Sequence, residues 1–265
     1  MLFRSRASEV GFELAGFLNT AGCYSEFAIR LYRLCLKRQE ITLGPEHPST
    51  LSSVNGLANL LSDQGDYAGA EPLYRRALAG FEKALGPEHP DTLSSVNNLA
   101  VLLSDQGDYA GAESLHRRAL AGKEKALGPE HPDTLSSVNN LANLLLRKGD
   151  YAGAEPLYRR ALAGREKALG PEHPSTLGSV NNLGITLNTL GRLPDAVQLL
   201  REKAALSPKA LEAVRYNLAC YECLSGNLDE AKRLITEEIS ADPEKKAVAL
   251  KDDDLKAIHD FIQSL

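Results

Sequence analysis

Four histidines recur at equal intervals and are the first residues whose type could support metal chemistry. They stand one in each copy of the string Gly-Pro-Glu-His-Pro, and the copies lie 42 residues apart: His47, His89, His131 and His173. Metal ligands must all lie about 2 Å from a single centre. Histidines carried one per repeat are spread along an array and do not converge. We therefore predict that they belong to linker structure and that no metal is bound.

Cysteine chemistry would have to come from Cys220 and Cys223, which have the Cys-x-x-Cys spacing of redox and zinc half-sites. The pair falls inside a predicted helix, and Cys23 and Cys35 are distant in sequence, so small apolar packing residues are the favoured interpretation. A regulatory thiol pair facing a ligand groove is the open alternative. The sequence contains no phosphate-binding loop, nucleophile elbow or zinc-protease motif. We predict no enzyme activity and no cofactor.

Arginine pairs form a third periodic pattern, at Arg75-Arg76, Arg117-Arg118 and Arg159-Arg160. A glutamate precedes the first arginine of each pair by four residues, a spacing that favours ion pairs along a helix: Glu71, Glu113 and Glu155. A neutralised outer face is therefore favoured over a phosphate-binding strip. The net charge of −5 also argues against a nucleic-acid partner, and no apolar run is long enough to span a membrane. We expect a cytoplasmic protein that binds neither nucleic acid nor membrane.

One 42-residue unit positions all of these residues. Residues 44–85 and 86–127 are identical at 36 of 42 positions, and residues 86–127 and 128–169 at 35 of 42. In the unit that begins at residue 86, Pro90 suits the first position of a helix. An apolar stripe at helical spacing follows, made of Val96, Leu99, Ala100 and Leu103.

The second half of the unit predicts a second helix. Gly107 can adopt the left-handed conformation that ends the first helix, and Asp108 can cap the next one. That helix runs from Tyr109 to Leu127 and is stopped by Gly128-Pro129. Such a helix pair exposes too much apolar surface to stand alone, so we predict that stacking on neighbouring pairs stabilises it.

The unit resembles the tetratricopeptide repeat through its pattern of small and large residues, Leu57-Ala58, Gly65, Tyr67, Ala70, Tyr74 and Ala77. The 42-residue period, the Val-Asn-Asn-Leu-Ala string and the Leu-Gly-Pro-Glu-His-Pro linker resemble the kinesin-light-chain type of that repeat, which also occurs in bacterial arrays. The resemblance covers residues 44–206 closely. It implies an all-α protein, a right-handed α-solenoid of helix pairs.

Looser matches extend the array in both directions. Residues 12–43 resemble a degenerate first repeat through Leu14-Ala15, Leu18, Gly22, Tyr24, Ala28 and Tyr32, and residues 209–243 fit the shorter form of the repeat. We predict a single solenoid over residues 1–265, with repeats at about 8–43, 44–85, 86–127, 128–169, 170–208 and 209–243. Residues 244–265 are predicted to form a C-terminal capping helix with a polar outer face.

The family resemblance implies that the first helix of each pair lines a concave groove and the second covers the convex side. The stripe opposite the core face then supplies the candidate peptide-binding residues: Asn55, Asn59 and Ser62; Asn97, Val101, Ser104 and Asp105; Asn139, Asn143, Leu146 and Arg147; Asn181, Ile185 and Asn188. Asparagine recurs at one position as Asn55, Asn97, Asn139 and Asn181. Amides can pair with the backbone of an extended peptide, and kinesin-light-chain-like arrays use groove asparagines in this way. The alternative is that these asparagines bond to the next helix and fix the stacking.

Differences between the repeats fall partly on this stripe, at Val101/Asn143, Ser104/Leu146 and Asp105/Arg147. They indicate a groove tuned to its ligand, with drift at exposed positions as the alternative. We expect asparagines 98, 140 and 182 to serve packing. Among the candidate groove residues only Arg147 is positive, so a carboxylate-anchored ligand is not favoured.

The favoured function is therefore a scaffold that binds a protein or peptide in its groove. A few neutral hydrogen bonds contribute about 1 kcal/mol each, so a short peptide should bind with roughly micromolar affinity. The alternative is a regulatory or sensor segment of a larger signalling protein, whose groove holds its own or an associated effector domain. The sequence assigns no partner and no oligomeric state.

Overall fold

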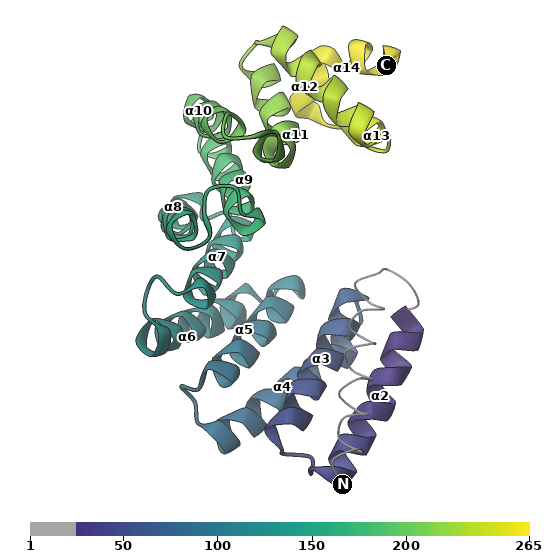
Figure 1. Ribbon diagram of the computed structural model, residues 1–265, viewed down its shortest axis with the longest axis vertical. Helices are drawn as coiled ribbons and strands as arrows, with labels where there is room; N and C mark the ends of the chain where they lie inside the picture. Colours follow the sequence, from purple (N-terminus) through teal and green to yellow (C-terminus); the bar gives the residue numbers. More distant parts are fainter. Residues whose placement is uncertain (1–24) are drawn as a thin grey trace. The chain divides into compact units, whose positions relative to one another are not determined.

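The computed structural model describes residues 25–265, and all regular structure in that range is helical. The helices are α2 (Ser25–Thr42), α3 (Pro48–Asp63), α4 (Tyr67–Leu85), α5 (Pro90–Asp105), α6 (Tyr109–Leu127), α7 (Pro132–Arg147), α8 (Tyr151–Leu169), α9 (Pro174–Thr189), α10 (Leu193–Ala204), α11 (Pro208–Leu224), α12 (Leu228–Ala241), α13 (Lys245–Ala249), the 3-10 helix η1 (Asp253–Ile258) and α14 (His259–Ser264) (Figure 1). None of the helices in this described range is long and apolar enough to cross a bilayer. The prediction of an all-α protein made of consecutive helix pairs is confirmed. The predicted repeat residues before Ser25 lie outside the described range.

The helix ends in the repeat 86–127 follow the predicted signals. Helix α5 begins at Pro90, with His89 as its N-cap, and ends at Asp105. Gly107 has a φ of 87°, in the left-handed region that glycine adopts without strain. The Asp108 carboxylate accepts a hydrogen bond from the N–H of Gly111 at 3.0 Å, and this contact caps α6.

Close contact within a pair depends on a glycine in the second helix. Gly80 in α4 and Gly164 in α8 each face a leucine of the preceding first helix, Leu51 and Leu135. A Cβ atom at either glycine would lie 2.6 Å from a leucine methyl group. Because that is far inside van der Waals distance, the glycine allows the two helices to pack at this separation.

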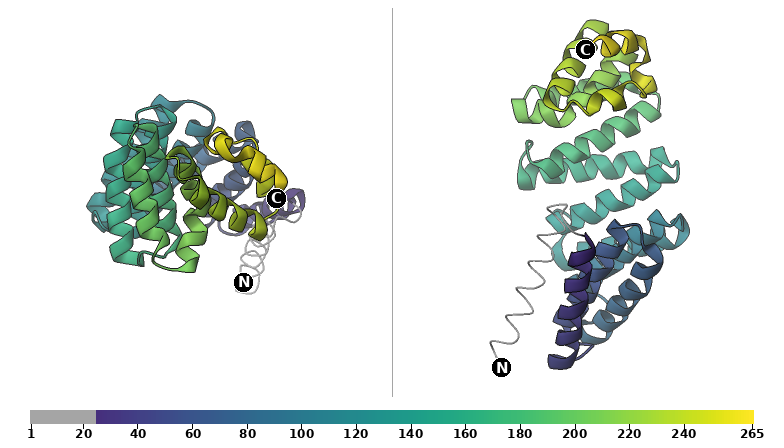
Figure 2. Two further views of the ribbon diagram at one scale, coloured as in Figure 1. Left: turned by 90° about the horizontal axis from the view of Figure 1, so that it is seen from above. Right: turned by 90° about the vertical axis from the view of Figure 1, so that its right-hand side faces the viewer.

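Contacts divide the chain into two compact units, residues 1–129 and 130–265. In the described part of the first unit, consecutive helices from α2 to α6 pack against one another (Figures 1 and 2). In the second unit the same holds from α7 to α12, and α9 also contacts α11. The predicted core stripe is buried, with Val96, Leu99, Ala100 and Leu103 at most 7% exposed. That the two units form one solenoid remains a prediction.

Ion pairs join successive second helices and also run along each of them. Along single helices, Arg75 pairs with Glu71 at 2.8 Å, and the equivalent pairs recur in α6 and α8, as the spacing predicted. Between helices, Arg76 of α4 pairs with Glu40 of α2 at 2.7 Å. The equivalent pair between α6 and α4, Arg118–Glu82, has the same length, and Lys203 of α10 reaches Glu166 of α8 at 2.6 Å. The outer face is thus largely neutralised.

The C-terminal cap covers the end of the last helix pair with three short helical segments, α13, η1 and α14. Leu255, Ile258 and Ile262 are at most 2% exposed and join the core of the second unit. The chain turns at Asp252, which has extended backbone angles and accepts the N–H of Asp254. Asp252 thus caps the start of η1, and the tail forms three short segments where one capping helix was predicted.

Candidate functional site

Each first helix presents one face to solvent, which we call the first-helix stripe. Its members are exposed or half-buried and follow one another at intervals of four, three and four residues: Ser52, Gly56, Asn59 and Asp63 on α3; Ser94, Asn98, Val101 and Asp105 on α5; Ser136, Asn140, Asn143 and Arg147 on α7; Gly178, Asn182, Ile185 and Thr189 on α9. This spacing places the residues of each helix on one side of it. The stripe is the surface on which a ligand could reach amide and aliphatic side chains together.

Most of the predicted ligand-facing residues lie on or beside this stripe, and two are buried. Ser104 is 4% exposed and Asn139 is 9% exposed. Asn55, Ser62, Asn97, Leu146, Asn181 and Asn188 are half-buried beside the stripe. The predicted line of asparagines is therefore one residue away from the residues 98, 140 and 182 that lie on the stripe itself. One residue corresponds to about 100° of rotation around a helix, so the two lines point in different directions: Asn181 bonds to α11 and Asn182 bonds to Asn143 of α7.

Asn181 makes hydrogen bonds to the next first helix. Its amide nitrogen donates to the backbone oxygen of Ala213 at 2.9 Å, and its amide oxygen accepts from Asn217 at 3.0 Å. Both partners belong to α11, so this side chain joins α9 to α11. The amide oxygens of Asn55 and Asn139 are buried and accept no hydrogen bond. Peptide contact by the four predicted asparagines remains a prediction, and at Asn181 the geometry matches its stacking alternative.

Two stripe asparagines are bound to tyrosines of the second helix in the same pair. The Tyr74 hydroxyl donates to Asn59 Oδ1 at 2.6 Å, and the Tyr158 hydroxyl donates to Asn143 Oδ1, also at 2.6 Å. Asn143 Oδ1 additionally accepts from the amide of Asn182 on α9 at 3.2 Å. Burial raises the pKa of both tyrosines well above the ordinary value, which keeps their hydroxyls protonated as donors.

This pairing accounts for one of the sequence differences on the stripe. Where Val101 replaces the asparagine, His116 replaces the tyrosine fifteen residues later, so the two positions change together. In the repeat after Asn143 and Tyr158 the same positions hold Ile185 and Leu200. The repeats with Asn59 and Asn143 keep the hydrogen-bonded pair of asparagine and tyrosine. The repeats with Val101 and Ile185 have neither member of that pair. The tyrosines were missed from the sequence, although their joint variation with the stripe position was visible there.

The loss of the asparagine leaves aliphatic side chains open to solvent. Val101 is 39% exposed and Ile185 is 40% exposed, each on a stripe whose other members are mainly polar. Each of the two compact units, residues 1–129 and 130–265, therefore carries one stripe asparagine that a tyrosine binds and one exposed aliphatic side chain. An amide beside an aliphatic group can bind a peptide backbone and an apolar side chain at once.

The periodic histidines are helix caps. In each, Nδ1 accepts the backbone N–H two residues later: at 3.2 Å for His47, His89 and His131, and at 3.1 Å for His173. One ring nitrogen is thereby committed to the start of each first helix. This is the linker role that the repeat spacing predicted.

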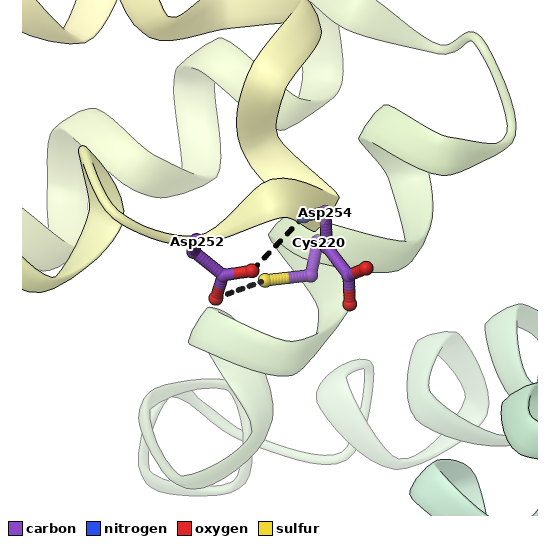
Figure 3. Close-up of side chains that lie close together, drawn as sticks. All are labelled: Cys220, Asp252 and Asp254. Carbon is purple, nitrogen blue, oxygen red and sulfur yellow. Dashed lines mark hydrogen bonds between the residues drawn. The ribbon is translucent and has the colours of Figure 1, made fainter.

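Cys220 lies in a small polar cluster with Asp252 and Asp254, beneath the C-terminal cap (Figure 3). Its thiol donates to Asp252 Oδ2 at 3.7 Å, and the Tyr216 hydroxyl donates to the same oxygen at 2.8 Å. Burial and the nearby carboxylates raise the pKa of this thiol, so it is held protonated. In this protonated form the thiol is a hydrogen-bond donor that anchors α11 to the cap. Cys223 is also buried.

Comparisons with known proteins agree with this architecture. The tetratricopeptide repeat family model matches residues 10–83, 51–125, 91–167 and 133–209. Two solved structures, one of them a point variant, show nearly identical tetratricopeptide-like repeats from a Podosopora anserina protein designated a kinesin light chain. Each is 31% identical over 76% of this chain and 94% of that one, with TM-scores of 0.65 and 0.64. BtubC (BKLC) of P. vanneervenii shares the fold at 20% identity, over 89% of this chain and 88% of that one, with a TM-score of 0.64. A comparison with curated proteins gives no match.

Proposed function

This chain belongs to the tetratricopeptide repeat family, and we propose that it is a scaffold that holds a peptide or partner segment along the first-helix stripe. Tetratricopeptide repeats generally mediate protein–protein interaction, and folds of the kinesin-light-chain type are typically scaffolds without catalytic activity. The coarse function is therefore protein binding. The finer assignment, to the stripe and its neighbours, is our proposal.

The exposed aliphatic side chains carry this proposal. Val101 and Ile185 remain 39% and 40% exposed, and they stand beside amides on the same helix face. Covering apolar surface contributes about 25 cal/mol per Å², and each neutral hydrogen bond about 1 kcal/mol. A ligand that used both would gain binding free energy from the aliphatic contacts in addition to the binding free energy from the amide hydrogen bonds. Half-buried Leu146 and Asn188 widen the same surface in the second unit.

The test compares a stripe variant with a matched variant of the outer face. Peptides are first selected from a library on the wild-type chain, and their affinities are then measured by fluorescence polarisation. The stripe variant carries Val101→Arg and Ile185→Arg. The control carries Ala121→Arg and Ala163→Arg, which add the same charge at exposed positions of α6 and α8. We expect binding to weaken at least about tenfold in the stripe variant only.

Equal affinities for the two variants would refute the stripe as the binding surface. A further variant with alanine at the four predicted asparagines separates ligand contact from stacking. Loss of peptide affinity without loss of thermal stability would assign them to the ligand, and loss of stability alone would assign them to stacking. The alternative of a regulatory segment occupied by an effector domain uses the same stripe, and the same variants would release that domain.

A further inference from the structure

The outer face of α2 differs from every other second helix in the described part of the chain by exposing large apolar side chains in a line. Phe27 is 54% exposed, Leu34 is 68% exposed and Ile41 is 78% exposed. They are seven residues apart, so they form one seam along the helix, about 21 Å long at 1.5 Å per residue. The opposite face, with Ala28, Ile29, Cys35 and Leu36, is buried. The seam therefore adds nothing to the packing of α2 on α3.

Cations border this seam on both sides. By helical periodicity Arg30 and Lys37 lie along one side of it and Arg38 along the other, with Arg33 further out. All four side chains are exposed, and Arg33, Lys37 and Arg38 form no ion pair with any side chain that the structure describes. In α4 and α6, by contrast, both arginines of each pair are neutralised by glutamates. The arginine pairs of α4 and α6 are thus balanced by glutamates, whereas Arg33, Lys37 and Arg38 of α2 have no such partner among the described side chains.

An alignment of α2 with α4 by the repeat shows which side chains of α2 differ from those of α4. Ala28 and Tyr32 correspond to Ala70 and Tyr74 of α4, so the offset is 42 residues. At that offset Leu34 stands where α4 has Arg76, and Ile41 stands where α4 has Lys83. Those two cations bind Glu40 and Glu46, which precede them in the array. The edge that elsewhere meets a preceding glutamate is therefore apolar in α2.

We propose that the outer face of α2 is a docking surface for an amphipathic helix of a partner protein that carries acidic residues beside an apolar seam. Heptad-spaced apolar residues pack against a second helix with the same spacing, and flanking charges select the partner by sign. The exposed cations beside the seam select acidic flanks. They also disfavour a second copy of this chain, because two α2 helices side by side would oppose like charges. The seam is three side chains long and narrow, which suits a helix better than a broad membrane surface.

The surface is independent of the first-helix stripe, and its test uses designed peptides. One peptide is a helix with leucine along a heptad seam and glutamate at the flanking positions, and its counterpart has lysine at those positions. Binding to the full chain is measured by isothermal titration calorimetry. We expect the glutamate peptide to bind and the lysine peptide to fail. In a variant with Arg30→Glu, Lys37→Glu and Arg38→Glu the preference should reverse, because the sign of the flanks has changed.

A second variant, Leu34→Arg with Ile41→Lys, gives α2 the side chains that α4 has at the same register. These exposed changes keep good helix-forming residues, and circular dichroism checks the fold. It should bind the glutamate peptide at least about tenfold more weakly despite its added positive charge. Unchanged or stronger binding would mean that charge alone, without the apolar seam, accounts for the binding. That result would overturn the proposal.

Three further results would also overturn it. The first is binding to phosphatidylcholine–phosphatidylserine vesicles with no binding of the glutamate peptide, which would indicate a membrane surface. The second is a dimer in sedimentation analysis that Leu34→Arg dissociates. The third is slow maleimide labelling of a Leu34→Cys variant in the free chain, which would mean that the seam is already covered. The chain without this substitution, whose thiols are Cys23, Cys35, Cys220 and Cys223, gives the background rate. We expect the variant to add one thiol that is labelled at the rate of an exposed group.

Discussion

His116 should make the stability of this protein fall when the solution is acidified. The side chain is 2% exposed, and its Nδ1 atom has no hydrogen-bond partner. Burial lowers its pKa to about 4, whereas an unfolded histidine titrates at about 6.5. Between these two values the unfolded chain binds more protons than the folded one. Stability is therefore full above about pH 6.5 and is lost as the pH falls toward the folded pKa.

The size of the effect follows from the two pKa values. One pKa unit corresponds to about 1.4 kcal/mol, so the full loss is about 3 kcal/mol, of which about 2 kcal/mol falls between about pH 7 and about pH 5. The comparison variant combines His116→Tyr with Val101→Asn, which restores the residues that form a hydrogen bond in the neighbouring polar repeats. Its stability should not show this part of the pH dependence. All other titrating groups are common to both proteins and cancel in the difference.

The measurement is the free energy of unfolding by urea at a series of pH values, followed by circular dichroism. The difference between the variant and the wild type should grow by about 2 kcal/mol as the pH is lowered from about 7 to about 5. Each single substitution is measured as well, because His116→Tyr alone places a hydroxyl opposite a valine position and should cost about 1–3 kcal/mol. Parallel pH profiles for wild type and double variant would refute the reasoning, since His116 would then titrate as it does in the unfolded chain.

Four other substitutions test the packing by urea unfolding. Tyr158→Phe removes a hydroxyl that donates at 2.6 Å and should cost about 1 kcal/mol; no loss would show that the bond is not formed in solution. Arg201→Met leaves the carboxylate of Glu222, 1% exposed, without its cation and should cost about 3 kcal/mol or more, whereas a change below about 1 kcal/mol would contradict the pairing. At Gly178 an added Cβ meets no atom within 4 Å, so Gly178→Ala should stabilise the folded protein by about 0.5–1 kcal/mol. Gly164→Ala should destabilise it by about 1–3 kcal/mol, because its Cβ would lie too close to Leu135. Equal effects of the two substitutions would contradict the packing.

The sequence predicted the elements well because their signals are local. The start at Pro90, the left-handed Gly107 and the cap at Asp108 all act within a few residues of one another, so no knowledge of the packing is needed to find them. The periodic repeat added the pairing of the helices, because a unit with one apolar stripe must bury it against its neighbour.

The candidate site was less predictable because it depends on rotation and on side chains from other helices. A shift of one residue separates Asn181, bonded to α11, from Asn182, bonded to Asn143 of α7. Periodicity alone does not resolve that difference on a helix whose faces both carry asparagine. The bond from Tyr158 to Asn143 required knowledge of two helices together. The contact between Cys220 and Asp252 joins residues 32 apart, across a cap whose fold the sequence showed only as a polar tail.

The two kinds of polar pair described above have different consequences for how such an array can change by recombination. The hydrogen bonds from Tyr74 to Asn59 and from Tyr158 to Asn143 join residues 15 apart, within a single repeat. The ion pairs between repeats, Arg76–Glu40 and Arg118–Glu82, join residues 36 apart and use the same residue types each time. A whole repeat can therefore be duplicated, deleted or exchanged with its variable pair intact and its junctions still matched. Exchange within a repeat would separate the tyrosine from its asparagine. Because whole repeats keep both kinds of pair, the gene can lengthen or shorten in units of 42 codons at little cost in stability.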